Sequence, residues 1–441
     1  MAQLRFAARR SLQSRAVFIA VLLLISAWYS GLARAAAPDQ VLEWNAIMNT
    51  SVLTGGSNPL VAARVAALVS GAVFDAVNGI DHRYRSLHVR PGASHPASQR
   101  AAAVQAAYAM LVMLYPLQQP ALAAQRDADI AALSTESATA VQNGVAWGQS
   151  VAESIFAWRS TDGLLPPPPP FLGVLGIEAA PNAVGVWRPT PVSNLSGAAP
   201  QFATMTPWVL QRPSQFRVAP PLALTSPEYA ADYNEVKVMG VLSGSGRTDD
   251  QSEFALFWTG NTPLYWNRIA AQVAATRSRS LVQNAHLLAL VNVSMADAAI
   301  ACWDSKYRYV TWRPITAIQE GDRDGNAATA AEPAWVPWLD TTAGTPPHPE
   351  YPSGHSTVSG AAAFVLAHVF GDETAFTVTS EARPGTRSFA SFSAALAEIN
   401  DARVFAGIHF RTSCVRANAL GATVAGYVLT HAMRADGEDE H

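Results

Sequence analysis

The segment that decides the fold is LVQNAHLLALVNVSMADAAIACWDSKYRYVTWRP, residues 281–314. Its first part is apolar at helical spacing and predicts a long helix from about Leu281 to Lys306. Residues 307–312 are aromatic and β-branched, and the proline that ends the segment disfavours helical backbone at Arg313. We therefore expect the chain to leave the helix here, so that Lys306 and Arg313 converge from a helix end and a loop.

The same alanine-rich, apolar pattern continues on both sides of this segment, with few β-branched runs. It predicts an all-α fold of packed helices. The helix predicted at residues 60–77 is apolar nearly all round, which is typical of a central helix. Asp75 near its end should therefore be buried. A buried acid of this kind is more often the structural partner of an arginine than a catalyst. Further helices are expected at residues 99–114, 121–158, 227–239, 249–258, 263–277 and 414–433.

Residues 1–35 have the features of an export signal. They carry five arginines and no acid, and their apolar run from Ala16 to Trp28 is too short to span a bilayer. Ala33–Ala35 is a small-x-small cleavage site, and Arg9-Arg10 partly matches a twin-arginine signal. We expect an exported protein, periplasmic or secreted by the Sec or twin-arginine route, without stable membrane insertion after signal removal. The alternative is an N-terminal anchor that stays in place.

Composition divides the remaining chain into three regions. Residues 36–160 form an N-terminal helical region, and residues 227–441 form a C-terminal helical region. Between them, residues 161–226 are rich in proline, which prevents regular helix. This irregular segment is either a linker or a flap that covers part of the body, and its scattered tryptophan, phenylalanine and leucine residues favour the flap.

The balance of charge narrows the class of partner. The chain has 30 Lys+Arg against 33 Asp+Glu, a formal net charge of −3. Without residues 1–35 the balance is 25 to 33, a net charge of −8, which argues against nucleic-acid binding. A charged fraction of 14 % with 49 % apolar residues excludes global disorder. Two cysteines exclude a disulfide framework, and Cys302 and Cys414 are either paired or free thiols.

A second segment with chemical potential is Pro-Ser-Gly-His-Ser at residues 352–356, which precedes an apolar helical run and a stop at Gly371. The pattern predicts a helix N-terminus, where free backbone N–H groups and the helix dipole attract anions. Ser353 adds a hydroxyl donor, Gly354 allows a close approach to the backbone, and His355 lies at the rim. The alternative is a serine N-cap with an incidental histidine.

The third segment runs from Arg403 to His409. Six residues correspond to about 240° around a helix, so these two side chains would not share a helix face. Gly407 offers a break that brings His409 back toward Arg403. The alternative for His409 is a core histidine at a helix junction.

Together the three segments supply one lysine, two arginines, two histidines, a serine and a glycine N–H. They lack the thiolate or carboxylate cluster of a zinc site and the Gly-x-Ser-x-Gly elbow of acyl transfer. The set suits a tetrahedral or trigonal-bipyramidal oxyanion, which three cations would neutralise through charge-assisted hydrogen bonds. One histidine would bond to the central atom while the other moves a proton.

The pattern Lys-x6-Arg-Pro, Pro-Ser-Gly-His and Arg-x5-His resembles that of the vanadium-dependent haloperoxidases and the related acid and lipid phosphatases of the type 2 phosphatidic acid phosphatase superfamily. The resemblance implies an all-α fold of packed helical bundles with vanadate, or phosphate, as the bound anion. His409 would ligate vanadium or attack phosphorus, His355 would be the acid–base catalyst, and Lys306 would polarise bound peroxide. The implied binders of the equatorial oxygens are Lys306, Arg313, Ser353, Gly354 and Arg403.

Two further positions and one departure follow from the resemblance. Trp303 lies three residues before Lys306, where haloperoxidases can carry a tryptophan near the site. His348 matches a histidine of bromide-type enzymes, where chloride-type enzymes have an aromatic residue. The family often has an aspartate four residues after the last histidine, but Ser413 stands there, which puts the tuning of His409 in doubt.

The resemblance implies a haloperoxidase that oxidises halide, bromide rather than chloride, with hydrogen peroxide for transfer to a small organic acceptor. The alternative is a soluble phosphomonoesterase that uses the same pocket through a phosphohistidine. A non-catalytic helical protein with a relic anion site is a third possibility. The length of the chain, His348 and Trp303 favour the haloperoxidase.

Overall fold

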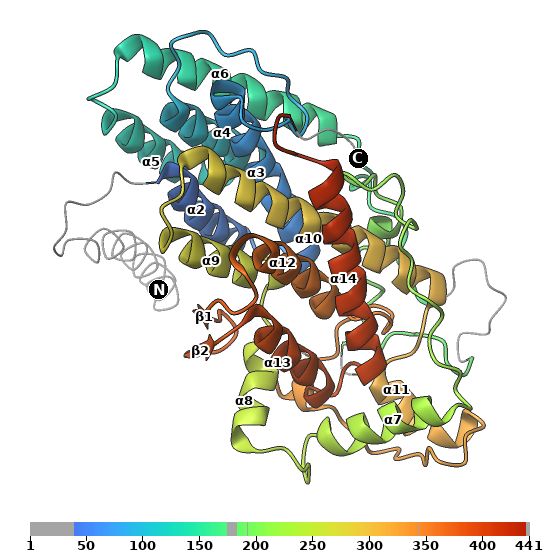
Figure 1. The fold of residues 1–441 in the computed structure, drawn as a ribbon. Coiled ribbons are helices and arrows are strands. Elements are labelled where there is room, and N and C mark those ends of the chain that lie inside the picture. The colour runs from blue at the N-terminus through green and yellow to red at the C-terminus, as the bar shows by residue number, and fades with distance from the viewer. Residues whose placement is uncertain (1–38, 174–182, 192, 343, 438–441) are drawn as a thin grey trace, which may run out of the picture. The chain divides into compact units, whose positions relative to one another are not determined.

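The long helix predicted from the central segment is α10, Leu281–Tyr309, and it is buried along most of its length. In the computed structural model it packs against α3 (Pro59–Asp81) on one side and against α12 (Gly354–Phe370) and α14 (Arg411–His431) on the other (Figure 1). The structure describes residues 39–173, 183–191, 193–342 and 344–437. The predicted export signal lies outside the described residues.

Local sequence explains where α10 begins and ends. Ser280 caps the N-terminus, and Gln283 returns the contact to the backbone of Ser280 in a capping box. At the other end, Val310 adopts a left-handed conformation with φ of 50°. The helix therefore continues three residues beyond the predicted end at Lys306, and the chain turns away immediately before Arg313.

An N-terminal group of helices lies on one side of α10. Here α4 packs against both α3 and α6. Gly144 and Gly148 allow the close approach of α6 to α4, because a Cβ atom at either position would lie about 2.5 Å from a backbone oxygen of residue 98 or 102. The helices are α2 (Gln40–Thr54), α3, α4 (Gln99–Leu114), α5 (Gln119–Ala131) and α6 (Ala138–Arg159).

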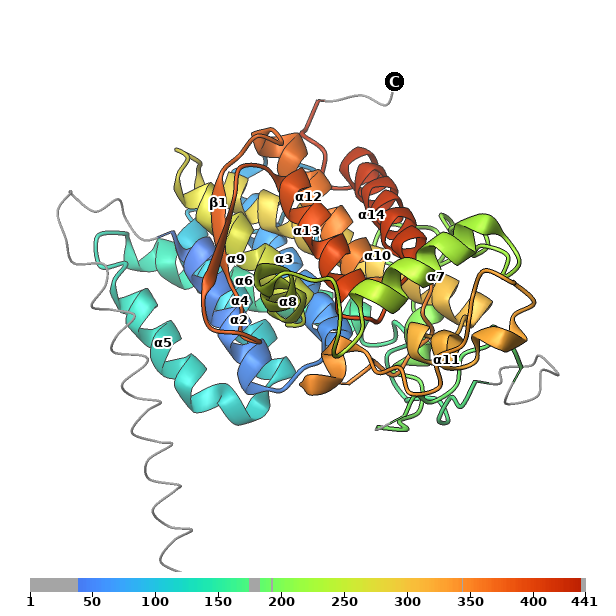
Figure 2. The same ribbon diagram turned by 90° about the horizontal axis from the view of Figure 1, so that it is seen from below.

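A C-terminal group lies on the other side of α10, as Figure 2 shows from below. Its closest pair is α12 and α14, where a Cβ atom on Gly421 would lie 2.1 Å from the Thr357 oxygen. A short antiparallel hairpin, β1 (Phe376–Thr379) with β2 (Thr386–Phe389), precedes α13. The other helices are α7 (Pro227–Met239), α8 (Asp249–Phe257), α9 (Thr262–Ala275), α11 (Pro314–Gln319) and α13 (Phe392–Phe405).

The described part of the Pro-rich segment is attached to α10 and to the chain that follows it. Asp297 is fully buried in α10, and its carboxylate accepts hydrogen bonds from three successive backbone N–H groups, at residues 208–210, over 2.6–3.0 Å. Farther along, Val186 forms an isolated β-bridge with Thr311, and Trp187 is fully buried. The segment therefore packs on the body by backbone hydrogen bonds as well as by apolar contact.

Asp75 is buried, as the apolar helix predicted, but its partner is not an arginine. Its carboxylate accepts the backbone N–H groups of residues 87–89 over 2.7–2.8 Å. Burial raises its pKa to about 6, and the three hydrogen bonds oppose that rise. The expected arginine partner is therefore wrong, because backbone donors in the loop after α3 satisfy the carboxylate.

The predicted helices are confirmed with shifts of a few residues at their ends, except that the range 121–158 is divided into α5 and α6 by a turn at residues 132–137. The helices α2, α11 and α13 and the β1–β2 hairpin were not predicted. Cys302 and Cys414 are buried free thiols. Within the described chain, α3 and α10 are long and apolar enough to cross a membrane, but 94 % of the most apolar window of each is buried, as in core helices.

Replacing Asp297 tests the attachment of the Pro-rich segment. In Asp297→Ala three buried backbone donors lose their acceptor, and each orphaned donor costs about 1–3 kcal/mol. We expect the free energy of unfolding in urea to fall by more than about 3 kcal/mol. Asp250→Ala removes the exposed ion pair with Arg387 and should cost about 1 kcal/mol or less. Equal losses in the two variants would contradict the assignment.

Candidate oxyanion site

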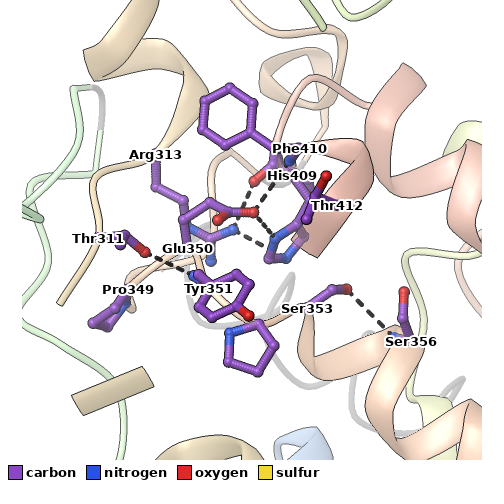
Figure 3. A network of polar contacts seen from close by, with 12 residues as sticks. Thr311, Arg313, Pro349, Glu350, Tyr351, Ser353, Ser356, His409, Phe410 and Thr412 are labelled. Atoms are coloured by element: carbon purple, nitrogen blue, oxygen red, sulfur yellow. Dashed lines mark hydrogen bonds and ion pairs between the residues drawn. The ribbon is translucent and has the colours of Figure 1, made fainter. Parts of the chain in front are cut away.

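Four helix ends and one loop bring the three sequence motifs together. Lys306 lies in the last turn of α10, and Arg313 precedes the first residue of α11. Ser353 caps the N-terminus of α12, and Arg403 lies in the last turn of α13. His409 is in the short connection between α13 and α14 (Figure 3). Residues far apart in the sequence thus meet where regular helices stop.

Lys306 is fully buried, and main-chain oxygens hold its ammonium group. Its Nζ donates to the carbonyls of Pro349 at 2.7 Å and Glu350 at 2.9 Å. Burial lowers the pKa of Lys306, and the charge of Arg313 lowers it further. Two of the three ammonium hydrogens are accounted for by these carbonyls, so the group has one donor left for an anion.

Arg313 ties its own segment to the segment of His409 and to the loop that precedes the Pro-Ser-Gly-His motif. Its Nη1 donates to the Ile408 carbonyl at 2.8 Å and to His409 Nε2 at 3.1 Å. Its Nε and Nη2 donate to the carbonyls of His348 and Pro346 at 2.9 and 3.0 Å. Burial lowers its pKa to about 9, so the guanidinium remains charged at neutral pH.

The turn before α12 has the geometry that the motif predicts. The Ser353 Oγ accepts the Ser356 N–H at 3.4 Å as an N-cap, which leaves its own hydrogen free to donate (Figure 3). A Cβ atom on Gly354 would lie 3.1 Å from the Trp303 ring and 3.9 Å from Lys306 Cε. Glycine therefore keeps the first amides of α12 accessible beside the lysine.

The predicted break after Arg403 is confirmed. Helix α13 ends at Phe405, and Gly407 has a φ of +79° with backbone packed against Gly240. Arg403 is buried and donates Nη1 to the Trp258 carbonyl at 3.1 Å. Its Nε is buried and has no hydrogen-bond partner among the described residues, so one donor of this cation is available to a ligand.

His409 is held from behind by a carboxylate that the sequence analysis missed. Its Nδ1 lies 2.8 Å from Glu350 Oε1, and the Phe410 N–H donates to the same oxygen at 3.1 Å. Because that oxygen accepts, Nδ1 carries the imidazole hydrogen and Nε2 keeps its lone pair. Nε2 is the atom that faces Arg313, so the nitrogen with the lone pair lies beside a buried cation (Figure 3).

The electrostatics of this pair follow from burial. Burial lowers the pKa of His409 well below its ordinary range, and Arg313 and Lys306 lower it further. Burial raises the pKa of Glu350, while the same two cations oppose the rise. His409 is therefore a neutral imidazole with an oriented lone pair. Glu350 takes the part of the aspartate that the family often has four residues after the last histidine, although Glu350 lies 59 residues before His409.

His355 lies at the partly exposed rim of the site. Its Nε2 is 3.3 Å from the Gly260 carbonyl oxygen. Burial and the nearby charge of Arg403 hold its pKa well below the ordinary value. A neutral histidine at this edge can accept a proton from a ligand that enters the pocket.

The two secondary positions, Trp303 and His348, are also brought to the site. Their rings lie 5.0 Å apart, and Arg313 Nη2 is 3.0 Å from His348 Nδ1. The Trp303 indole donates to the carbonyl of Ala198 at 3.1 Å, and the Ala198 N–H donates to Pro347 in the His348 loop. The Pro-rich segment thereby supports this edge of the pocket.

The donor set fits a small oxyanion such as vanadate or phosphate. Three buried cations converge, a serine hydroxyl and a helix N-terminus add neutral donors, and Arg403 Nε is an unsatisfied buried donor. A neutral imidazole nitrogen faces the same space. The carboxylate of Glu350 lies behind His409, so it does not repel an anion bound at Nε2 (Figure 3).

Comparisons with known proteins find similarity over the part of the chain that carries the three motifs. Residues 286–437, which contain all three motifs, match a family model described as the VCPO second helical-bundle domain. Over 258 residues the chain is 26 % identical to the vanadium chloroperoxidase of Curvularia inaequalis. The alignment covers 49 % of this chain and 41 % of that relative. The chain thus spans about two-fifths of the length of that relative.

Solved structures share the fold over most of the chain. One described as the first bacterial vanadium-dependent iodoperoxidase aligns with a TM-score of 0.76 at 24 % identity, over 93 % of this chain and all of that one. A holo-type bacterial vanadium-dependent chloroperoxidase aligns with a TM-score of 0.62 at 17 % identity, over 84 % and 90 % of the two chains. The chain therefore shares the helical-bundle fold of these structures, and its residues 286–437 are similar to the second helical-bundle domain of the matching family.

Glu350→Gln tests how the carboxylate supports His409. The amide oxygen can still accept from Nδ1, but the charge that makes Nε2 a better electron donor is lost. We expect the affinity for orthovanadate to fall about 10–100-fold, as is typical when the partner of a ligand histidine is changed. Equilibrium dialysis with vanadium analysis measures the change.

A matched glutamate provides the control for that variant. Glu332 has a half-exposed side chain and lies outside the motifs, so Glu332→Gln should bind vanadate like the parent chain. An unchanged affinity in Glu350→Gln would show that the carboxylate does not tune His409.

Proposed function

We propose that the chain is a vanadium-dependent haloperoxidase that oxidises bromide with hydrogen peroxide and passes the halogen to a small organic acceptor. The observation that carries the proposal is the neutral His409, oriented by Glu350, with Nε2 directed at Arg313 in a site that also holds the buried Lys306 and Arg403. The names of the relatives, chloroperoxidase and iodoperoxidase, support the reaction class.

Each residue has a part in this reaction. Vanadate, when bound, supplies the Lewis-acid centre at which peroxide becomes reactive toward halide. His409 would hold it through Nε2. The side chains of Lys306, Arg313 and Arg403 would neutralise its oxygens, helped by the Ser353 hydroxyl and the Gly354 N–H. Because the cations are already buried and held by carbonyls, little reorganisation accompanies anion binding.

Proton movement falls to His355 in this proposal. Hydrogen peroxide must lose a proton on entering the site, and His355 is neutral and at the partly exposed rim. The remaining ammonium hydrogen of Lys306 would donate to a peroxide oxygen and draw electron density from it. The two roles are compatible because both groups border the Gly354 turn.

We also propose that the mature chain works outside the cytoplasm. The support is the arginine-rich, apolar sequence of residues 1–35 and its small-x-small site.

One purified sample assayed in two ways tests the activity. With vanadate, peroxide and bromide, we expect bromination of phenol red. Without vanadate, a chromogenic phosphate should not be hydrolysed. In His409→Ala both vanadate retention and bromination should be lost, because no other imidazole takes the place of Nε2. His368→Ala changes an exposed histidine of α12 and is the matched control.

The opposite pattern would identify the phosphatase alternative. Phosphate hydrolysis that depends on His409, with no vanadate-dependent bromination, would mean that the same pocket forms a phosphohistidine. Vanadate would then act only as an inhibitor that resembles the transition state of phosphoryl transfer.

The choice of halide is tested at His348. Its ring lies beside Trp303 and Arg313 at the edge of the pocket. In His348→Phe this edge loses a polar ring and becomes apolar. We expect kcat/KM for chloride relative to bromide to rise severalfold, measured at fixed peroxide. An unchanged ratio in a variant that still retains vanadate would remove His348 from halide selection.

A further inference from the structure

A cavity of about 300 Å³ lies behind the oxyanion site, on the far side of the Glu350–His409 pair. Neither His409 nor the cations of the anion pocket line it. Its walls come from residues 184–186 and 221–224 of the Pro-rich segment, from the first turns of α7, and from the chain on either side of Glu350 and Phe410. Glu350 thus lies between the cavity and the anion pocket, and no cation of the anion pocket lines the cavity.

Aromatic side chains make up much of the lining of this rear cavity. The rings belong to Tyr229, Tyr309, Trp312, Tyr351 and Phe410. Tyr309 and Tyr351 donate their hydroxyls to the carbonyls of Val218 and Ala219, both over 2.7 Å. These bonds fix the rings against the Pro-rich segment and hold the walls of the cavity in place.

The polar groups of the rear cavity define the ligand further. Two carboxylates, Asp232 and Glu350, line it, and its lining contains no lysine, arginine or histidine. The Tyr229 hydroxyl and the Trp312 indole N–H are buried there beside each other, and the Ser413 hydroxyl is buried beside Glu350. A ligand hydroxyl that reaches these groups would add a hydrogen-bond partner to them.

We propose that the rear cavity binds a small, neutral, single-ring aromatic molecule with a hydroxyl group, of the phenol class. The ring would pack between the aromatic walls, and the hydroxyl would donate to Glu350 or Asp232 while accepting from a buried donor. Two carboxylates without a neighbouring cation in the lining exclude an anionic ligand. The site is separate from the anion pocket and goes beyond the proposed function.

The test measures binding without the reaction. The full chain, free of vanadate, peroxide and halide, is titrated with 4-fluorophenol and followed by ¹⁹F NMR. We expect saturable broadening of the ligand signal. Fluorobenzene, which lacks the donor, and 4-fluorobenzoate, which is an anion, should each bind at least tenfold more weakly. Because no vanadate is present, failure here is distinct from failure of the proposed peroxidase activity.

Variants that fill the rear cavity locate the binding. Leu222 lines it, so Leu222→Trp should weaken 4-fluorophenol binding at least tenfold. Leu195→Trp alters an exposed leucine of the same Pro-rich segment outside the cavity and should bind like the parent chain. If circular dichroism shows that Leu222→Trp is unfolded, Ala223→Trp at the exposed edge of the lining replaces it. Absence of saturable binding, or equal binding in parent and cavity variants, would overturn the proposal.

Discussion

Burial of three cations in one pocket is the constraint on which the rest of the structure depends. Lys306, Arg313 and Arg403 repel one another and have lost their water, and burial lowers the pKa of each. Carboxylates could compensate that cost, but they would also neutralise the field that attracts an anion. Main-chain carbonyls instead accept from all three cations, and they provide partial negative charge without a full counter-ion.

This choice of partner explains why irregular chain surrounds the site. Carbonyls inside a helix are already bonded to N–H groups four residues later, so free carbonyls must come from loops and helix ends. The proline-rich loop at residues 346–350 supplies four of them to Lys306 and Arg313. Prolines also hold that loop extended and add no competing N–H donors. The regular bundle positions the helix ends, and the loop completes the coordination of the charges.

Much of the fold and of the site could be predicted from the sequence, because helical periodicity and motif spacing are local signals. Glu350 could not, since its link to His409 is a contact across 59 residues with no fixed spacing. A lone glutamate between two prolines, at residues 349 and 352, was the available hint. The partner of Asp75 was missed for a similar reason, because backbone donors have no signature in side-chain identity. The β1–β2 hairpin has strands of four residues, too short for a clear alternation.

Glu350 reconciles two opposed requirements of the site. An anion pocket needs no nearby negative charge, whereas a ligand histidine benefits from a carboxylate that fixes its tautomer. Placing the carboxylate on the Nδ1 side puts the imidazole ring between it and the anion. The cost is a buried negative charge beside the three buried cations, which the Phe410 N–H and the fields of Lys306 and Arg313 offset. The carboxylate must then border other space, and here it borders the aromatic rear cavity. The geometry that orients His409 therefore also gives the rear cavity its acidic wall.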